Sequence, residues 1–206
     1  MTSGVAALCA WFNAHGTSCT EVLGFSTGVL NVWLVTREHL LSWPIGLLNA
    51  VFYLMVFARA GLYADTGLQV VYFVLSAIGW WRWQRGGEAG TPLQITRAQA
   101  KDWWRILAAV MIAWIALALI TAQIPGAAMP WADGFLVAIS LVAQWLMTRK
   151  VLEHWILWIV ANVGYIALFF VRGLMLTSVL YVIFLALATI GFIRWQQSWR
   201  TTKSIA

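Results

Sequence analysis

Two tryptophans and an asparagine in one apolar stretch could bind a flat polar ligand. Trp155, Trp158 and Asn162 stand at positions i, i+3 and i+7, so on an α-helix they share one face. Residues 152–171 are otherwise apolar apart from two residues near their start, and an amide in such a stretch is costly unless something hydrogen-bonds to it. A bond to a neighbouring helix, with the indoles as packing residues, explains the same spacing, so the spacing alone leaves both interpretations open.

A second polar face lies on residues 63–83. Its members recur at i, i+4, i+7, i+11 and i+14 and are Asp65, Gln69, Tyr72, Ser76 and Gly79. A helix in lipid does not turn such a face outward, because polar groups there lack partners. Hydrogen bonds between helices would also account for these residue types. For the whole face we favour the lining of a cavity, with Gln69, Tyr72 and Ser76 as ligand contacts.

Further polar and aromatic side chains complete the predicted substrate-binding set. They are Trp43, Asn49, Tyr53, Gln144, Tyr165 and Tyr181, with Thr27 and Asn31 as weaker candidates. Asp65 and Asp133 lie near the ends of apolar stretches, where a carboxylate is more often solvated than a proton carrier. Ion coupling therefore has no obvious carrier, and facilitated diffusion is the simplest mechanism.

The sequence offers no pattern for catalysis, a metal site or a cofactor. It contains no Ser/His/Asp set, no H-E-x-x-H, no Walker-type phosphate loop and no cluster of metal ligands. The adjacent Glu153 and His154 resemble a helix start more than an acid–base pair. We therefore expect a protein that is not an enzyme and needs no cofactor.

The composition predicts an all-α integral membrane protein. The chain has 206 residues, of which 62% are hydrophobic and 10% charged, and its mean hydropathy is +0.81. Soluble domains carry roughly 25% charged residues. The length accommodates about seven spans of ~20 residues. They are predicted at residues 20–35, 40–58, 63–83, 103–123, 131–148, 152–171 and 174–195.

The basic residues divide unequally between the two sides of the predicted membrane. Only Arg59 and Arg172 fall on the side of the N-terminus, whereas the other eleven of the 13 Lys and Arg residues fall on the opposite side. Those eleven are Arg37, Arg82, Arg85, Arg97, Lys101, Arg105, Arg149, Lys150, Arg194, Arg200 and Lys203. The positive-inside rule places the N-terminus outside and the C-terminus in the cytoplasm, and it explains the pI near 9.8 without nucleic acid.

The chain contains an internal repeat. A shift of 112 residues superposes residues 33–83 on residues 145–195 with 18 identities in 51 positions, several of them Trp, Arg or Gly. Each copy holds three spans, and the span between the copies restores the direction of the second. The predicted fold is therefore two parallel three-helix repeats joined by a linker helix (3+1+3), a plan used by transporters. A duplicated scaffold without transport activity is the alternative.

This repeat defines the expected domains and sharpens the site. We expect a lead-in segment at 1–19, repeat one at 20–83, a loop and linker helix at 84–130, repeat two at 131–195 and a basic tail at 196–206. Trp155 and Tyr165 are matched by identical residues in repeat one, so we expect part of their role to be structural. Trp158 and Asn162 fall on Gly46 and Ala50. A lining that breaks the symmetry is expected when one asymmetric ligand sits on the pseudo-axis.

Six motifs in four stretches of the chain together resemble the PnuC family of bacterial nicotinamide riboside transporters. They are WPIGLLN at 43–49, LYADTGLQVVY and GWWRW within 62–83, WILWIVAN at 155–162, and GLMLTSVLY and GFIRW within 173–195. The resemblance implies a full-length relative of the SWEET architecture in the bacterial inner membrane. It also implies Trp155, Trp158 and Asn162 as substrate contacts, and Gln69 and Asn49 with less support.

The resemblance further implies uptake of nicotinamide riboside for NAD synthesis, with a cytoplasmic ribosyl-nicotinamide kinase that traps the substrate. A pyridinium cation over an indole gains about 0.5–2 kcal/mol, and an amide side chain can pair with the ligand's carboxamide. Transport of another vitamin such as thiamine or riboflavin, and a pore for small polar solutes, stay as alternatives. The sequence also leaves open a homo-oligomer and a disulfide between Cys9 and Cys19.

Overall fold

A computed structural model describes residues 19–59, 63–87, 90–124, 129–173 and 175–205, and this described part is all-helical. Its helices are α2 (Cys19–Thr36), α3 (Ser42–Arg59), α4 (Tyr63–Arg85), α5 (Ala100–Ala122), α6 (Pro130–Thr148), α7 (His154–Val171) and α8 (Met175–Ile205). The predicted fold class is confirmed. The lead-in segment expected at 1–19 lies outside the described residues except for Cys19, which is disulfide-bonded.

Five of these helices are long and apolar enough to cross a membrane: α3, α5, α6, α7 and α8. Helix α2 contributes a shorter apolar segment, Val22–Thr36. Helix α4 carries the polar face predicted from the sequence and ends in two arginines, which lowers its mean hydropathy. Both nevertheless lie within the same bundle, because α2 packs on α3 and α4 packs on α3.

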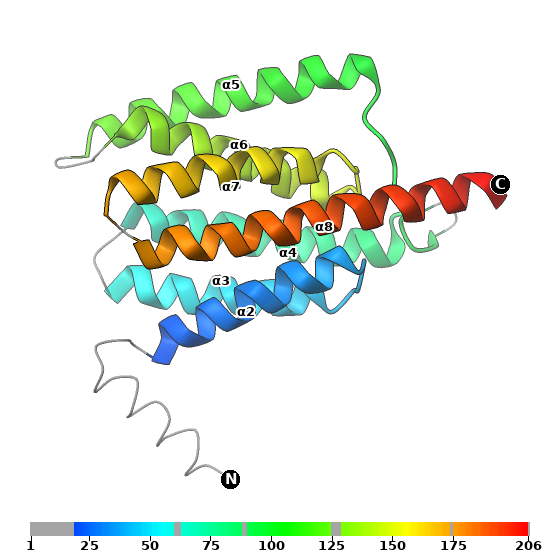
Figure 1. Cartoon of the computed structure of the whole chain (residues 1–206), viewed down its shortest axis with the longest axis horizontal. Coiled ribbons are helices and arrows are strands. Elements are labelled where there is room, and N and C mark those ends of the chain that lie inside the picture. Colours follow the sequence, from blue (N-terminus) through cyan, green and yellow to red (C-terminus); the bar gives the residue numbers. More distant parts are fainter. Residues whose placement is uncertain (1–18, 60–62, 88–89, 125–128, 174, 206) are drawn as a thin grey trace, which may run out of the picture.

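Helix α8 continues to Ile205, whereas the predicted seventh span ended at residue 195 and a tail was expected after it. The extra turns contain Gln, Arg, Lys and Thr without Gly or Pro, so nothing in them breaks the helix. Figure 1 shows α8 projecting past the other helices at one end of the bundle.

The helices pack as two three-helix units. Helices α2, α3 and α4 contact one another in chain order, and so do α6, α7 and α8. Between the units, α2 packs on α8 and α4 packs on α6, which is the reciprocal pairing that two parallel copies around an axis require. Helix α5 packs on α6, at the outside of the bundle (Figure 1).

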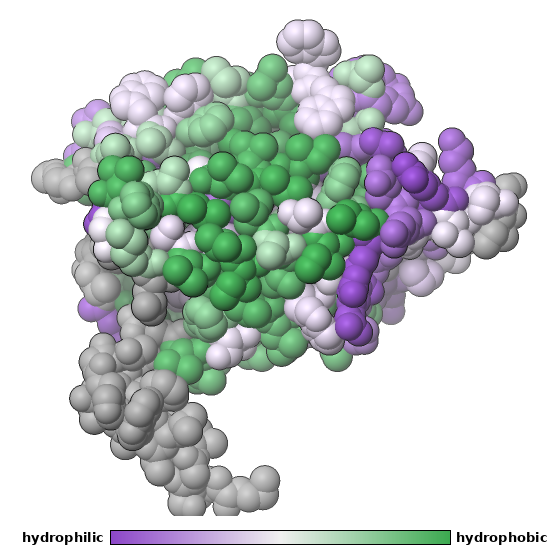
Figure 2. All heavy atoms as spheres, viewed as in Figure 1, coloured by the Kyte–Doolittle hydropathy of each residue, from purple (hydrophilic) through white to green (hydrophobic). Residues whose placement is uncertain are grey.

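The surface suits a bilayer. Large apolar side chains face outward on several helices, among them Ile112 and Val171, each 70% exposed. Figure 2 shows an apolar surface across the middle of the molecule and hydrophilic residues gathered at the end from which α8 projects. We call this the basic end; there α2, α4 and α6 end and α3 and α7 begin.

Candidate functional site

Near the basic end, each repeat has a tryptophan side chain packed directly against a glycine of the next helix within the same repeat. Trp43 of α3 lies against Gly79 of α4 so closely that a methyl group at Gly79 would overlap the indole. In the second repeat Trp155 lies in the same way on Gly191. Trp43 and Trp155 are 1% and 2% exposed, and their shared role in packing explains why the repeat retains both residues.

The same tryptophans form a ring cluster with the tryptophans four residues beyond these glycines. The Trp43 and Trp83 ring centroids are 5.1 Å apart at 85°, and those of Trp155 and Trp195 are 5.8 Å apart at 87°. The site prediction for Trp43 and Trp155 came from their type and spacing. The structure surrounds them with protein, so in this conformation they are packing residues.

Four predicted tyrosines from both repeats gather farther from the basic end. The rings of Tyr165 and Tyr181 lie 4.7 Å apart. Tyr181 is within electrostatic range of Tyr53 and Tyr72. The four side chains come from α3, α4, α7 and α8, so the contact between repeats brings them together.

A serine that the sequence analysis did not select joins this tyrosine group. Ser140 of α6 is buried, interacts with the hydroxyls of Tyr72 and Tyr165, and donates to the Leu136 carbonyl oxygen at 2.8 Å. Its spacing could have revealed it, because Ser140 precedes the predicted Gln144 by one helical turn and shares its face.

The predicted amides fall into two groups. Asn49 donates through Nδ2 to the Gly24 carbonyl at 2.6 Å and to Thr27 Oγ1 at 3.1 Å, so it ties α3 to α2. Asn162 and Gln144 are buried, at 4% and 7% exposure, and Gln69 is half-buried. Within the described residues, no side-chain hydrogen bond engages these three amides.

Trp158 and Ser76 occupy intermediate positions. Trp158 is half-buried on α7 between the turns that carry Trp155 and Asn162, and it packs against both core clusters of the bundle. Ser76 is 4% exposed on α4, one turn from Tyr72. Both therefore lie between the tryptophan cluster at the basic end and the tyrosine group.

Glu153 and His154 act at a helix start, as their sequence context indicated. Glu153 is 1% exposed and accepts from the Ala98 backbone N–H at 2.7 Å and from Arg97 Nε at 2.9 Å. His154 Nδ1 lies 2.7 Å from the Val151 carbonyl oxygen. These contacts fasten the segment before α5 to the start of α7.

The expectation of solvated carboxylates fits Asp133 only in part. Asp133 is half-buried and interacts electrostatically with Tyr165 and Tyr181. The Asp65 side chain lies outside the described part of the structure.

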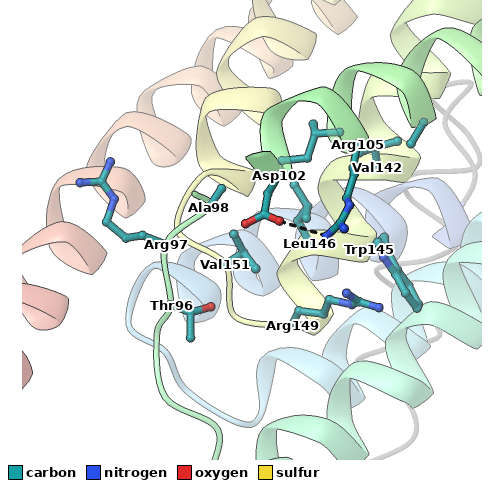
Figure 3. Close-up of a pocket in the computed structure, with 12 residues that line it drawn as sticks. Thr96, Arg97, Ala98, Asp102, Arg105, Val142, Trp145, Leu146, Arg149 and Val151 are labelled. Carbon is teal, nitrogen blue, oxygen red and sulfur yellow. Dashed lines mark hydrogen bonds and ion pairs between the residues drawn. The ribbon is translucent and has the colours of Figure 1, made fainter. Parts of the chain in front are cut away.

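Two cavities of about 300 and 400 Å³ open at the basic end. The smaller lies between α5, α6 and the segment before α5; Figure 3 shows Arg105 paired with Asp102 there and Arg97 turned away. Neither cavity is lined by a predicted substrate contact. The predicted residues are thus grouped by helix packing rather than around either of these cavities.

Fold and site together define a membrane transporter built from two parallel repeats. The chain belongs to the family described as nicotinamide mononucleotide transporter, which matches residues 18–197. The chain is 27% identical to the nicotinamide riboside transporter PnuC of Escherichia coli K12, over 93% of this chain and 91% of that protein. It is 25% identical to the riboflavin/roseoflavin transporter RibM of Streptomyces davaonensis, over 85% and 84% of the two chains.

A solved structure gives the same result. The crystal structure of the vitamin B3 transporter PnuC superposes with a TM-score of 0.74 and 25% identity, and the match covers 96% of this chain and 88% of that one. The suspected PnuC relationship is therefore confirmed, and so is the expectation that the chain is a transporter.

Proposed function

We propose that this chain takes up nicotinamide riboside by facilitated diffusion. The observation that carries the proposal is the meeting of aromatic, hydroxyl and amide side chains at the contact between the repeats: the four tyrosines with Ser140, and nearby Asn162 and Gln144. PnuC proteins named as nicotinamide riboside transporters are among the relatives.

The chemistry of these side chains suits this substrate. Trp158 and the tyrosine rings offer faces for a pyridinium cation. Asn162, Gln144 and Gln69 can pair with the carboxamide, and Tyr72, Ser76 or Ser140 can meet ribose hydroxyls. The opened site would also expose Trp43, Asn49, Tyr53, Trp155, Tyr165 and Tyr181 as weaker contacts.

We further propose the direction and the setting. The chain lies in the bacterial inner membrane with the basic end in the cytoplasm, because eleven of its 13 Lys and Arg residues are at that end. A cytoplasmic kinase would trap the substrate by phosphorylation, since a phosphate ester would not return through an apolar path.

The test is calorimetry on purified protein with nicotinamide riboside, nicotinamide mononucleotide, thiamine and riboflavin. We expect nicotinamide riboside to bind most tightly and its uptake into proteoliposomes to saturate. Tighter binding of riboflavin would instead support the activity named for the RibM relative. Uptake that never saturates would support a pore.

A further inference from the structure

The first inference starts from two equivalent turns at the basic end. Helices α2 and α6 end in the same way, with the His39 N–H donating to the Leu34 carbonyl at 3.0 Å and the Val151 N–H to the Leu146 carbonyl at 3.2 Å. Both turns contain a residue with φ of 55°, Glu38 in the first and Lys150 in the second. This left-handed conformation usually belongs to glycine, so two side chains are present where helix ends commonly have none.

Glu38 and Lys150 are equivalent in the repeat, and they contact each other. Lys150 Nζ lies 2.8 Å from Glu38 Oε2, with the two side chains 12% and 26% exposed. Two equivalent residues can touch only where the pseudo-axis passes between them. This ion pair therefore lies on the axis that relates the two repeats.

A second equivalent pair lies beside the first. The Trp83 and Trp195 ring centroids are 5.6 Å apart, and the Lys150 ammonium lies 4.9 Å from the Trp83 ring and 6.0 Å from the Trp195 ring. We call Glu38, Lys150, Trp83 and Trp195 the axial layer. It closes the contact between the repeats at the basic end.

Two hydrogen bonds join the axial layer to the opposite repeat. Trp83 Nε1 donates to the Met147 carbonyl of α6 at 3.0 Å, and Trp195 Nε1 donates to the Val35 carbonyl of α2 at 2.9 Å. Val35 and Met147 are also equivalent under the shift of 112 residues. Separation of the repeats at this end would break both bonds.

Unpaired polar atoms lie next to this layer. In the described part of the chain, the buried side-chain atoms without a hydrogen-bond partner are Ser42 Oγ, Trp43 Nε1, His154 Nε2 and Trp155 Nε1. These atoms belong to the dipeptides Ser42-Trp43 and His154-Trp155, which superpose under the shift of 112 residues. Buried groups without a partner are costly, so they raise the energy of the closed arrangement relative to one that admits water or a polar solute.

We propose that the axial layer is a gate, held shut by the Glu38–Lys150 ion pair and opened when the repeats separate at the basic end. A solute that follows the axis to this end must pass between Trp83 and Trp195. The inference rests on the proposed transport function but not on the identity of the solute.

The test measures access to the layer. Ser42→Cys places a thiol at a buried site whose hydroxyl has no partner, and a charged thiol reagent is applied to inverted vesicles. Lys150→Met keeps most of the stem over the rings but removes the charge. We expect Lys150→Met and Glu38→Gln, each combined with Ser42→Cys, to raise the rate at which the reagent labels the thiol by about fivefold to tenfold.

The charge-swapped variant Glu38→Lys/Lys150→Glu should return labelling close to that of the parent. Lys101→Ala is the matched control, because Lys101 is exposed at the same end and outside the layer. Protein without Ser42→Cys measures background from native cysteines. The gate would be overturned if the labelling rate stayed unchanged in Lys150→Met and Glu38→Gln. It would also be overturned if the charge-swapped variant were labelled as fast as those two variants. Labelling needs no substrate, so it stays interpretable if the ligand is not nicotinamide riboside.

A second inference comes from the larger cavity at the basic end. This cavity has a volume of about 400 Å³. Its lining residues within the described part of the chain are Trp81, Arg82, Arg85, Gly86, Leu93 and Arg149, none of which carries a carboxylate. Arg82 and Arg149 both lie over the Trp145 ring, at 5.1 and 4.5 Å from its centroid. Ion pairs within the described residues involve Arg97, Arg105 and Lys150 instead.

The wall of this cavity has no equivalent in the second repeat, where α8 continues as a helix. The wall is the segment after α4, held by bonds from the Gly86 N–H to the Arg82 carbonyl at 2.7 Å and from the Leu93 N–H to the Trp83 carbonyl at 3.2 Å. The equivalent Arg37 also lies over an indole, 4.2 Å from the Trp33 centroid, but α8 continues there as a helix and supplies no such wall.

We infer that this larger cavity, lined by Arg82, Arg85 and Arg149, binds a phosphate group. The phosphate is carried either by an anionic phospholipid headgroup or by a soluble phosphate ester. Three guanidinium groups around one cavity repel one another unless an anion is shared between them. Guanidinium pairs with phosphate through two parallel hydrogen bonds. Basic pockets of this kind on the cytoplasmic side of membrane proteins recognise lipid headgroups.

The test compares two double variants of equal charge. Purified protein is titrated with phosphatidylglycerol in mixed micelles, with phosphatidylcholine as the neutral reference, and separately with inorganic phosphate. We expect Arg82→Gln/Arg149→Gln to lose about tenfold in phosphatidylglycerol affinity, whereas Arg37→Gln/Arg194→Gln, the equivalent positions in the other repeat, keeps it.

Binding of inorganic phosphate that depends on Arg82 and Arg149, without preference for phosphatidylglycerol, would identify the soluble source. Equal losses in the two double variants would show a general effect of charge and overturn the site. So would equal binding of the anionic and the neutral lipid by the parent protein.

Discussion

Asn49 and Asn162 are the same residue type in two apolar helices, yet their surroundings differ. The Asn49 amide is committed to two acceptors on α2, whereas no side-chain hydrogen bond within the described residues engages the buried Asn162 amide. The first amide therefore serves the fold in this conformation, and we propose the second as the ligand contact.

We predict that Asn162→Ala lowers affinity for nicotinamide riboside by about fivefold to 100-fold, the effect of losing one buried hydrogen bond to a ligand. The thermal unfolding temperature without ligand should stay near that of the parent. Calorimetry on purified protein measures the affinity. Gln197→Ala removes an exposed amide from α8 and is the control. Parent-like affinity in Asn162→Ala would contradict the site.

For Asn49→Ala we predict the opposite pattern. Loss of both bonds to α2 should destabilise the bundle by about 1–3 kcal/mol while the affinity of the folded protein changes little. Thermal unfolding in detergent, followed by calorimetry at low temperature, separates the two effects. A large loss of affinity at an unchanged unfolding temperature would contradict this prediction and identify Asn49 as a direct substrate contact.

At the scale of elements, the contact between the second and third helices of each repeat depends on glycine. Trp43 and Trp155 occupy the space above Gly79 and Gly191, so each helix pair approaches more closely than a side chain would allow. Trp43 and Trp155 also contact Trp83 and Trp195 of the axial layer. The close packing at Gly79 and Gly191 therefore helps to set the geometry of the proposed gate.

We predict that Gly79→Ala or Gly191→Ala destabilises the protein by about 1–3 kcal/mol, because the added methyl group would overlap an indole. Gly67→Ala is the control, since Gly67 lies in the same helix as Gly79 with no heavy atom within 4 Å of the added methyl position. Higher helix propensity should leave that variant slightly stabilised. Chemical or thermal unfolding in one detergent compares all three, and equal effects would contradict the packing role.

The sequence predicted these elements well, because apolar length and the repeat are local and periodic signals. It did not predict the extent of α8, since a polar helix beyond the membrane has no hydrophobic period to mark its end. The Glu38–Lys150 contact was also missed. The two residues differ, so the alignment of the repeats shows them as a mismatch, and only the packed turns reveal that they meet.

For the candidate site, sequence reasoning selected tyrosines that the fold brings together, but it could not distinguish a ligand contact from a packing residue. Trp43 and Trp155 illustrate the difficulty, because an indole at a given helical position serves either purpose. Ser140 was overlooked since a single serine in an apolar helix is common. Such choices depend on the distance between helices, which a single sequence does not contain.

At the scale of the whole molecule, the charged residues of the described helices stand near the helix ends or, in α8, in its C-terminal half, and the middle of the face seen in Figure 2 is apolar. The middle turns of these helices carry aromatic and neutral polar residues such as Tyr72 and Asn162. A cationic ring can be accommodated there by aromatic faces. A phosphate would be desolvated among the helices without a basic partner from the middle of the described spans. We therefore expect the bundle to favour a nucleoside over its nucleotide.

We predict that nicotinamide mononucleotide competes with nicotinamide riboside at least about 100-fold less effectively, because an unpaired phosphate in an apolar path costs several kcal/mol. The measurement is competition against labelled nicotinamide riboside in proteoliposomes. Nicotinamide, which lacks the ribose, serves as a second competitor to report what the hydroxyl groups contribute. Equal competition by the mononucleotide would place a phosphate contact on the path.

The Glu38–Lys150 pair also bears on how such a chain can arise from a smaller ancestor. Two separate copies of repeat one would bring Glu38 against Glu38 on the shared axis, and two copies of repeat two would bring lysine against lysine. Like charges in contact oppose such homodimers. In one fused chain the two positions can carry opposite signs, so at this contact each half prefers the other to a copy of itself.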